Sequence, residues 1–264
     1  MLAPCLERHH GARANARAAL AFFLDYYAFE RQGRSPDYSP AAVDAVYASA
    51  GLDPSEIWSR YERLLGGRKL NRANNPLCPR GTPFERGKTS HQTWQPSAVE
   101  FIRTDQSPRN MLLWARDELV VDRTAETHRA LCSINGIGTK IASFFLRDVA
   151  ESSGIAVSLD RHLLQPVDVW VYRLAELTCG GPRQRTGEEC ARAIVEKSLA
   201  EDVSPERVNQ GMWYFATQVC GSSEYVVKRT IRDGAVWEAI EDHVAGIRDS
   251  ADRTAEAWER LQCR

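Results

Sequence analysis

The sequence predicts an all-α fold, and three observations support this. Apolar residues recur every three or four positions along most of the 264 residues, as on one face of a helix. The two-residue alternation that is typical of strands is scarce. Helix-start signals are frequent: Thr186 and Glu189 have the spacing of a capping box, and Ser204 precedes Pro205 at a first helical position. We therefore expect short, packed helices rather than a coiled coil.

The N-terminal part should contain three helices, at residues 12–31, 40–50 and 54–65. The first of them has a strongly apolar face, which should turn towards the core. Its aromatic residues are interpreted as core side chains: Phe22, Phe23, Tyr26 and Tyr27.

Residues 66–96 interrupt the helical pattern and should form a long loop, because they are rich in Gly, Pro and Asn. Six Lys or Arg residues oppose one acid, Glu85, so the loop carries a net charge of +5. One interpretation is a solvated surface loop. The other is a contact with DNA, through phosphates and through a side chain that fills the gap left by an extruded base. The candidate residues for this contact are Arg72, Arg86, Lys88 and Trp94.

The second half of the chain is predicted to be helical, with short connections. The expected helices are at residues 107–121, 124–133, 139–151, 169–177, 188–199 and 205–219, with two more after residue 224. The connection between 124–133 and 139–151 is short and contains two glycines, so these two helices should form a hairpin.

This hairpin connection is the most informative motif of the chain. Gly136 and Gly138 permit a tight turn that exposes backbone amides at a helix start, where a phosphate can bind. Gly136, Gly138 and Thr139 are therefore candidate phosphate-binding residues. Lys140 falls in the first turn of the following helix, where the helix dipole disfavours added positive charge and favours the neutral, nucleophilic amine.

A carboxylate follows the hairpin in the run Pro166-Val167-Asp168, directly before a predicted helix. Asp168 could stabilise the positive charge that develops on a sugar as its base departs, or could move protons. It could equally be an N-cap, because an Asp side chain accepts backbone hydrogen bonds at a helix start, and the two roles are compatible. Together, Lys140 and Asp168 are suited to attack on a sugar C1′.

Residues 124–177 resemble the helix-hairpin-helix DNA glycosylases of the endonuclease III and 8-oxoguanine glycosylase superfamily. The pattern of that family runs Pro, Gly, an aliphatic residue, Gly, any residue and Lys, with Val-Asp further on. Here Gly-Ile-Gly-Thr-Lys occupies residues 136–140, and Val-Asp occupies residues 167–168. The resemblance places the Schiff-base lysine at Lys140 and the catalytic aspartate at Asp168.

Three features depart from the family pattern. Asn135 replaces the usual Pro, and Trp170 stands where many relatives carry a His. The connection between lysine and aspartate is also longer than in the better-known members. A long connection occurs in the archaeal-type 8-oxoguanine glycosylases, so this chain is closest to that subgroup in spacing.

The resemblance implies a helix-hairpin-helix DNA glycosylase fold, with two helical subdomains and the active-site cleft between them. In one glycosylase unit, residues 1–105 would form an N-terminal helical region that includes the basic loop at 66–96. Residues 106–220 would form the catalytic region, and residues 221–264 the C-terminal helices.

By the same resemblance, we expect a bifunctional DNA glycosylase and AP lyase that acts on double-stranded DNA with a modified base, with 8-oxoguanine as the leading candidate. An oxidised pyrimidine or a hypermodified base is the alternative within this class, because the shape of the pocket decides the substrate. A noncatalytic helix-hairpin-helix DNA-binding module is the alternative outside it. A helical protein-interaction scaffold is a third possibility.

A glycosylase must flip its target nucleotide into a pocket that stacks on the base and hydrogen-bonds its edge. The best candidates lie on the helix predicted at 205–219, where aromatic and amide side chains gather. They are Asn209, Gln210, Trp213 and Phe215. Ordinary core packing is the competing interpretation for these aromatic residues.

No cofactor and no catalytic metal are expected. The seven cysteines form no CxxC pair, no zinc spacing and no compact iron-sulfur pattern, so they should be reduced thiols. The family resemblance allows one monovalent cation at the hairpin, held by the main-chain carbonyls of Cys132, Ile134 and Ile137.

The composition sets further bounds. The net charge of −1 means that any DNA-binding surface must come from local segregation of basic residues. No apolar run is long enough to cross a membrane, and the N-terminus lacks the architecture of a secretory signal. We therefore expect a cytoplasmic, DNA-associated monomer with no membrane partner.

Overall fold

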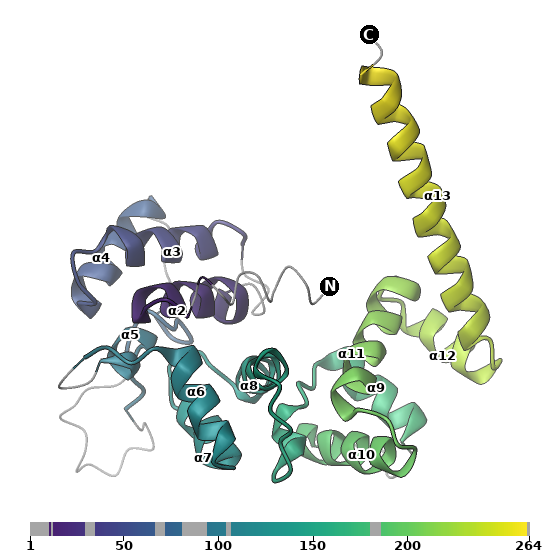
Figure 1. Ribbon diagram of the computed structural model, residues 1–264, viewed down its shortest axis with the longest axis horizontal. Coiled ribbons are helices and arrows are strands. Elements are labelled where there is room, and N and C mark those ends of the chain that lie inside the picture. Colours follow the sequence, from purple (N-terminus) through teal and green to yellow (C-terminus); the bar gives the residue numbers. More distant parts are fainter. Residues whose placement is uncertain are drawn as a thin grey trace. The chain divides into compact units, whose positions relative to one another are not determined.

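The computed structural model describes residues 11, 13–29, 35–66, 72–80, 94–103, 107–179 and 186–262, apart from the side chains of 256–262. Within these residues the fold is all-α, as predicted, and no strand forms (Figure 1). An antiparallel bridge joins Arg80 to Gln95. The chain divides into two compact units, residues 1–166 and 167–264, and this boundary lies inside the predicted catalytic region 106–220.

The first unit is built from helices within the described residues. Its elements are α2 (Ala16–Phe22), the π-helix η1 (Phe23–Phe29), α3 (Tyr38–Ala48), α4 (Pro54–Leu64), α5 (Ala98–Ile102), α6 (Met111–Val120), α7 (Thr124–Cys132), α8 (Thr139–Ser153) and the 3-10 helix η4 (Arg161–Leu164). The predicted helices over 40–50, 54–65, 107–121, 124–133 and 139–151 correspond closely to α3, α4, α6, α7 and α8.

The second unit is also built from the helices that the sequence predicted. Its elements are α9 (Val169–Thr178), α10 (Gly187–Ala200), α11 (Pro205–Tyr214), the π-helix η5 (Phe215–Val219), α12 (Glu224–Arg232) and α13 (Val236–Gln262). Both N-terminal signals are confirmed: Thr186 and Glu189 form a capping box, and Ser204 caps α11 with Pro205 in its first turn.

α5 was not predicted, although its start carries a readable signal. The Ser97 backbone amide donates to Glu100 Oε2 at 2.8 Å, and the Glu100 amide donates to Ser97 Oγ at 3.2 Å. These two bonds form a capping box over a helix of five residues. The prediction missed it because so short a helix shows no apolar period.

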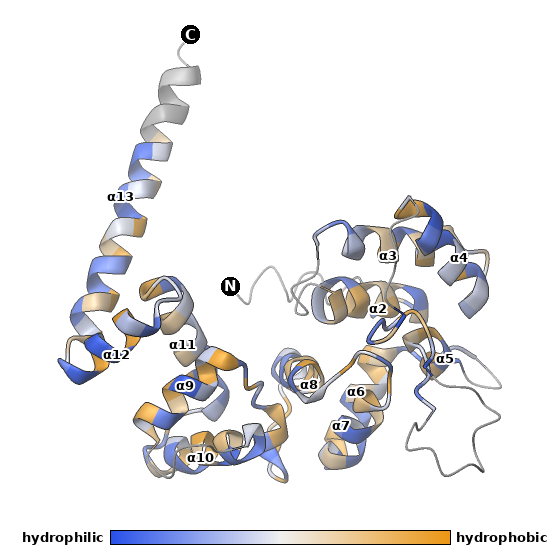
Figure 2. Cartoon of the chain, turned by 180° about the vertical axis from the view of Figure 1, so that it is seen from behind, coloured by the Kyte–Doolittle hydropathy of each residue, from blue (hydrophilic) through white to orange (hydrophobic). Residues whose placement is uncertain are grey.

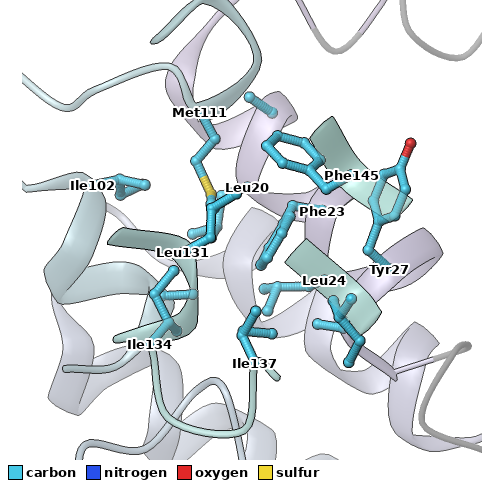
Figure 3. Close-up of a cluster of buried hydrophobic side chains, with 14 of the residues drawn as sticks. Leu20, Phe23, Leu24, Tyr27, Ile102, Met111, Leu131, Ile134, Ile137 and Phe145 are labelled. Carbon is cyan, nitrogen blue, oxygen red and sulfur yellow. The ribbon is translucent and has the colours of Figure 1, made fainter. Parts of the chain in front are cut away.

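The core of the first unit forms around α2, η1 and α8. Phe145 contacts Phe23 and Tyr27 edge to face, with ring centroids 5.1 and 5.2 Å apart. Leu131, Ile134 and Ile137 from the hairpin point into the same cluster (Figure 3). The predicted core role is confirmed for Phe23 and Tyr27, whereas Phe22 and Tyr26 are only partly buried.

The second unit has two smaller apolar clusters. One contains Leu174, Phe215 and Val227, and the other contains Val171 and Ile194. Along the helices of each unit, hydrophobic and hydrophilic residues are interspersed, as expected for helices that pack on one face (Figure 2). Among the described residues, no helix is both long and apolar enough to cross a membrane.

Candidate functional site

The predicted hairpin forms in the first unit between α7 and α8. Ile134 and Ile137 are buried and anchor the turn, and the Ile137 amide donates to the Ile134 carbonyl at 3.0 Å. Gly136 lies between them with φ of +79°, a left-handed conformation that disfavours any residue with a Cβ. The two isoleucines therefore hold the turn from inside, while the glycine permits its sharp reversal.

Gly136 is also required by a close contact. A Cβ atom at this position would lie 2.2 Å from the carbonyl oxygen of Asn74, which is far below van der Waals contact. A Cβ atom at Gly138 would meet no described atom of another segment within 4 Å, so the role of this glycine differs from that of Gly136. The first glycine fits the turn against the segment 72–80, and the second keeps the turn open to solvent.

Asn135, which replaces the family proline, holds this segment in place. Its side chain is fully buried, and Nδ2 donates to the carbonyls of Arg72 and Cys78 at 2.9 and 2.7 Å. Oδ1 accepts from the Asn74 amide at 3.1 Å, and the Asn135 amide donates to the Pro96 carbonyl at 2.9 Å. One side chain thus joins the hairpin to the described part of the predicted basic loop.

The start of α8 faces solvent. Gly138 is the N-cap in an extended conformation, and within the described residues no side chain caps the first turn. Gly138 and Thr139 are exposed, and Lys140 is half-buried. Exposed amides at an uncapped helix start, with the positive end of the helix dipole behind them, can bind an anion.

His128 on α7 connects the two hairpin helices, and Cys132 lies one turn after it on α7. His128 is buried, and its Nε2 lies 3.3 Å from the Thr139 carbonyl and 3.2 Å from Ser143 Oγ. Its Nδ1 lies 3.7 Å from Cys132 Sγ. Burial raises the pKa of the Cys132 thiol to about 11, so this thiol is neutral and unreactive near pH 7. Cys132 is half-buried and packs against the core of the first unit.

A buried polar cluster fixes α8 against η1 beyond the lysine. Tyr27 Oη donates to Asp148 Oδ2 at 3.1 Å, and Arg147 Nη2 lies 2.9 Å from Asp148 Oδ1. The Arg147 guanidinium also covers the ring of Phe144, 4.8 Å from its centroid. The cluster satisfies both buried charges and holds the lysine-bearing helix in place.

Phe144 and Phe145 follow Lys140 on α8. Phe145 is buried in the core, and Phe144 is half-buried and packs against the same core. It lies four residues after Lys140 and therefore on the same helix face. Because Arg147 covers one face of its ring and the core of the first unit contacts it as well, Phe144 holds α8 in place.

Asp168 lies at the start of the second unit, whereas Lys140 belongs to the first. Asp168 is half-buried and is the N-cap of α9, where its Oδ1 accepts from the amides of Trp170 and Val171, both at 2.9 Å. Both cap bonds end on Oδ1, so the cap does not use Oδ2. Trp170, at the family's histidine position, packs on the adjacent core beneath the guanidinium of Arg173.

The candidate residues of the basic loop are only partly described. Arg72 is exposed, donates to Glu62 Oε1 at 3.3 Å and lies over the ring of Trp58. Trp94 is half-buried beside the Arg80 and Gln95 bridge. Arg86 and Lys88 lie outside the described residues.

The four candidate pocket residues all lie in the second unit, on α11 and η5. Asn209 is buried, whereas Gln210 is half-buried. Trp213 packs against one apolar cluster of this unit, and Phe215 is a buried member of the other. Packing therefore accounts for much of the aromatic surface here, and Gln210 and Trp213 are the more accessible pair.

The hairpin carbonyls predicted to hold a monovalent cation belong to Cys132, Ile134 and Ile137. The Ile134 carbonyl already accepts the Ile137 amide at 3.0 Å and has one lone pair left for an ion. In the described part of the chain, no group of three or more His, Cys, Asp or Glu residues could hold a metal ion.

Comparison with models of protein families, with curated proteins and with solved structures found no match. The functional interpretation therefore depends on the hairpin, the lysine and the aspartate themselves.

Proposed function

We propose that this chain is a bifunctional DNA glycosylase and AP lyase with a helix-hairpin-helix glycosylase fold. Its substrate would be double-stranded DNA that carries an oxidised or otherwise modified base, with 8-oxoguanine as the leading candidate. The observation that carries the proposal is the exposed, uncapped start of α8, which places Gly138, Thr139 and Lys140 together in one helical turn.

The residues of this turn match two requirements of the chemistry, which are a site for a DNA phosphate and an amine close to the sugar. Gly138 and Thr139 offer backbone amides to a DNA phosphate at the positive end of a helix dipole. Lys140 follows within the same turn, so a phosphate bound there would bring a deoxyribose close to its amine.

In the proposed reaction, Lys140 Nζ attacks C1′ of the damaged nucleotide, and the bond from C1′ to the base breaks. The departing base takes the bonding electron pair and a proton. The sugar then opens to an iminium ion on Lys140, which acidifies the proton on C2′. Loss of that proton expels the 3′ phosphate by β-elimination. Asp168 is assigned to stabilise the positive sugar as the base departs.

Borohydride trapping tests the proposal directly. Borohydride reduces the iminium ion and leaves a covalent complex of protein and DNA. The substrates are duplexes with 8-oxoguanine, an oxidised pyrimidine, an abasic site or no lesion. Trapping on 8-oxoguanine is the expected result, and trapping only on the other modified base would replace the substrate. No trapping on any duplex would contradict the proposal.

Substitution of the lysine identifies the reacting amine. Lys140→Gln should abolish trapping, because the amide cannot form an iminium ion. Lys197→Gln is the matched control, since Lys197 is exposed on α10 and has no proposed role. A Lys140→Gln protein that still traps at the normal level would show that another amine reacts.

The aspartate is tested by Asp168→Asn. An Asn side chain is also a good N-cap, so α9 should stay folded while the negative charge is lost. We expect base excision to slow by roughly a hundredfold to a thousandfold, as for other losses of transition-state charge stabilisation. Gel shifts with lesion DNA should show unchanged binding. Unchanged excision would remove Asp168 from the mechanism.

A noncatalytic helix-hairpin-helix DNA-binding module is the second candidate, and one observation favours it. Asp168 already has a structural role as the N-cap of α9, so its presence does not require chemistry. Such a module would bind DNA with a strong dependence on salt, yet would neither cleave nor trap any lesion duplex. The same trapping series therefore separates the two candidates.

A further inference from the structure

α13 (Val236–Gln262) is the longest helix, and its outer part has no partner among the described residues. Every residue from 244 to 255 is exposed. Within this stretch, Val244 and Ile247 are 39% and 50% exposed. Trp237, near the helix start, is 74% exposed. Figure 2 shows hydrophobic residues interspersed among hydrophilic ones along α13. A helix with an apolar stripe normally buries that stripe against another element.

The stripe follows a heptad repeat. Its residues alternate between steps of three and four: Trp237, Ile240, Val244, Ile247, Ala251 and Thr254. In heptad notation these are successive a and d positions, beginning with Trp237 at a. The sequence continues the repeat with Trp258 and Leu261. The outer b, c and f positions are mostly charged, as they are in a two-stranded coiled coil.

The seam begins on the core of the second unit and then leaves it. Ile240 packs against the cluster that contains Leu174 and Phe215, and His243 lies 3.1 Å from Tyr214 Oη. The g flank of the seam, where His243 lies, is therefore in contact with the unit. The e flank contains Glu241 and Arg248, which are both exposed.

We propose that α13 pairs with α13 of a second copy of this chain, antiparallel, as a short two-stranded coiled coil. The register sets Val244 against Ile247 of the second copy. It also sets Ala251 of the second copy against the part of Ile240 that its own unit leaves open, and Thr254 of the second copy against Trp237. Large residues then meet small ones in the outer layers, and two branched residues of similar size meet at the centre.

Charge complementarity supports the same register. In an antiparallel pair, the e flanks of the two helices face each other. Glu241 and Arg248 of the second copy then both lie between the layer of Ile240 and the layer of Val244. They can form an ion pair, and the two-fold symmetry of the dimer produces this pair twice. A parallel pair would bring the e flank against the g flank and set Arg248 beside His243, with no acid opposite. The antiparallel arrangement is therefore favoured.

This proposal is independent of the proposed DNA chemistry and departs from the monomer that the sequence led us to expect. The expectation of short packed helices holds for the other helices but not for this one. The partner is a second copy because the seam is complementary to itself in both side-chain size and charge.

Analytical ultracentrifugation of the full chain tests the proposal. We expect a reversible dimer with twice the mass of the chain. Ile247→Asp should weaken it at least a hundredfold, roughly, because a buried unpaired carboxylate is strongly disfavoured. Asp249→Lys, an f-position change on the outer face, should leave the dimer unchanged. A protein that is monomeric at every attainable concentration would overturn the proposal and leave this face to a different partner.

A charge exchange tests the register without disturbing any core. Glu241→Arg and Arg248→Glu should each weaken the dimer roughly tenfold, since each replaces two exposed attractive pairs by repulsive ones. The double variant should restore the wild-type affinity, and high salt should reduce all of these differences. Weakening that is additive in the double variant, or no weakening in either single variant, would overturn the antiparallel pairing.

Discussion

Gly136 shows how a single residue positions the hairpin. Its backbone is left-handed, and the Asn74 carbonyl occupies the space where a Cβ would lie. Gly138, two residues later, has φ of −95° and open space around it. Glycine is therefore needed at position 136 because of its backbone conformation and its close contact, whereas neither applies at position 138. The sequence pattern alone does not distinguish these two cases.

A matched pair of substitutions tests this difference between the two glycines. Gly136→Ala should lower the free energy of unfolding by about 3 kcal/mol, because it adds both backbone strain and a steric clash. Gly138→Ala should lower it by no more than about 1 kcal/mol, the usual range for a change at an N-cap. Urea denaturation of the two variants measures this. Equal losses would show that the contact with Asn74 does not restrain the turn.

Cys132 makes a pH-dependent contribution to stability. Its pKa is raised by burial from 9.0 to about 11, so the folded state holds the thiol proton more tightly than the unfolded state does. The resulting stabilisation is fully present below pH 9.0 and is lost as the pH rises towards about 11. Cys132→Ala should therefore show a smaller loss of stability over this range than the wild type. Other buried thiols, such as Cys78 and Cys220, are common to both proteins and cancel in the comparison. Parallel pH profiles would contradict this assignment.

At the scale of elements, the sequence predicted most of the fold. Amphipathic periodicity and caps located every long helix, since a helix that packs on one side must repeat its apolar residues at helical spacing. Two kinds of element were missed. α5 and the 3-10 helix η4 are too short to show a period. The π-helical turns η1 and η5 differ from α-helix by hydrogen-bond register, which leaves no mark in composition.

The sequence predicted the part of the candidate site that depends on neighbouring residues, and it missed the part that depends on distant ones. Local sequence located the hairpin and its lysine because the turn depends on residues that are adjacent in the chain. The Asn135 contacts were not predictable, because they join it to main-chain groups about sixty residues away. A proline at that position would stiffen the turn locally, whereas asparagine makes the turn depend on the segment 72–80.

The exposed start of α8 leads to a prediction in which stability and binding change in opposite directions. Thr139→Glu should stabilise the fold by about 0.5 kcal/mol, because a negative charge near a helix N-terminus is favourable. The same charge should weaken DNA binding roughly fivefold to tenfold, as expected for like charges about 4 Å apart in water. Fluorescence anisotropy and thermal unfolding measure the two effects.

Ser55→Glu is the matched control for this prediction. Ser55 is exposed in the first turn of α4. A negative charge there interacts with the dipole of α4 as a charge at Thr139 does with the dipole of α8, but far from the hairpin motif in sequence. It should stabilise the fold and leave DNA affinity unchanged. If both variants weakened binding equally, the effect would come from net charge and not from a phosphate site at α8.

At the scale of the whole molecule, two units with separate apolar clusters make up the chain. The first is the larger, and most of its core surrounds α8, which has Lys140 in its first turn. The second contains Asp168 and the amphipathic α13. With a net charge of −1, the chain as a whole has no general attraction for DNA, so binding should depend on local sites.

Separate cores predict separate responses to core substitutions. Phe145→Ala should destabilise the first unit by about 4 kcal/mol, and Ile194→Ala should destabilise the second by about 3 kcal/mol, as large-to-small core changes usually do. Differential scanning calorimetry should show each variant shifting a different transition. A single transition shifted by both variants would mean that the units unfold as one.

The N-cap formed by Asp168 has an evolutionary consequence. Because its carboxylate holds the start of α9, natural selection for a folded protein would keep an acid or a close substitute at this position even in a descendant that had lost its chemistry. Under the proposed function, Lys140 is selected for its reactive amine, so a descendant without that chemistry would lose this selection. Among homologues, the lysine and not the aspartate should therefore distinguish active enzymes from inactive descendants.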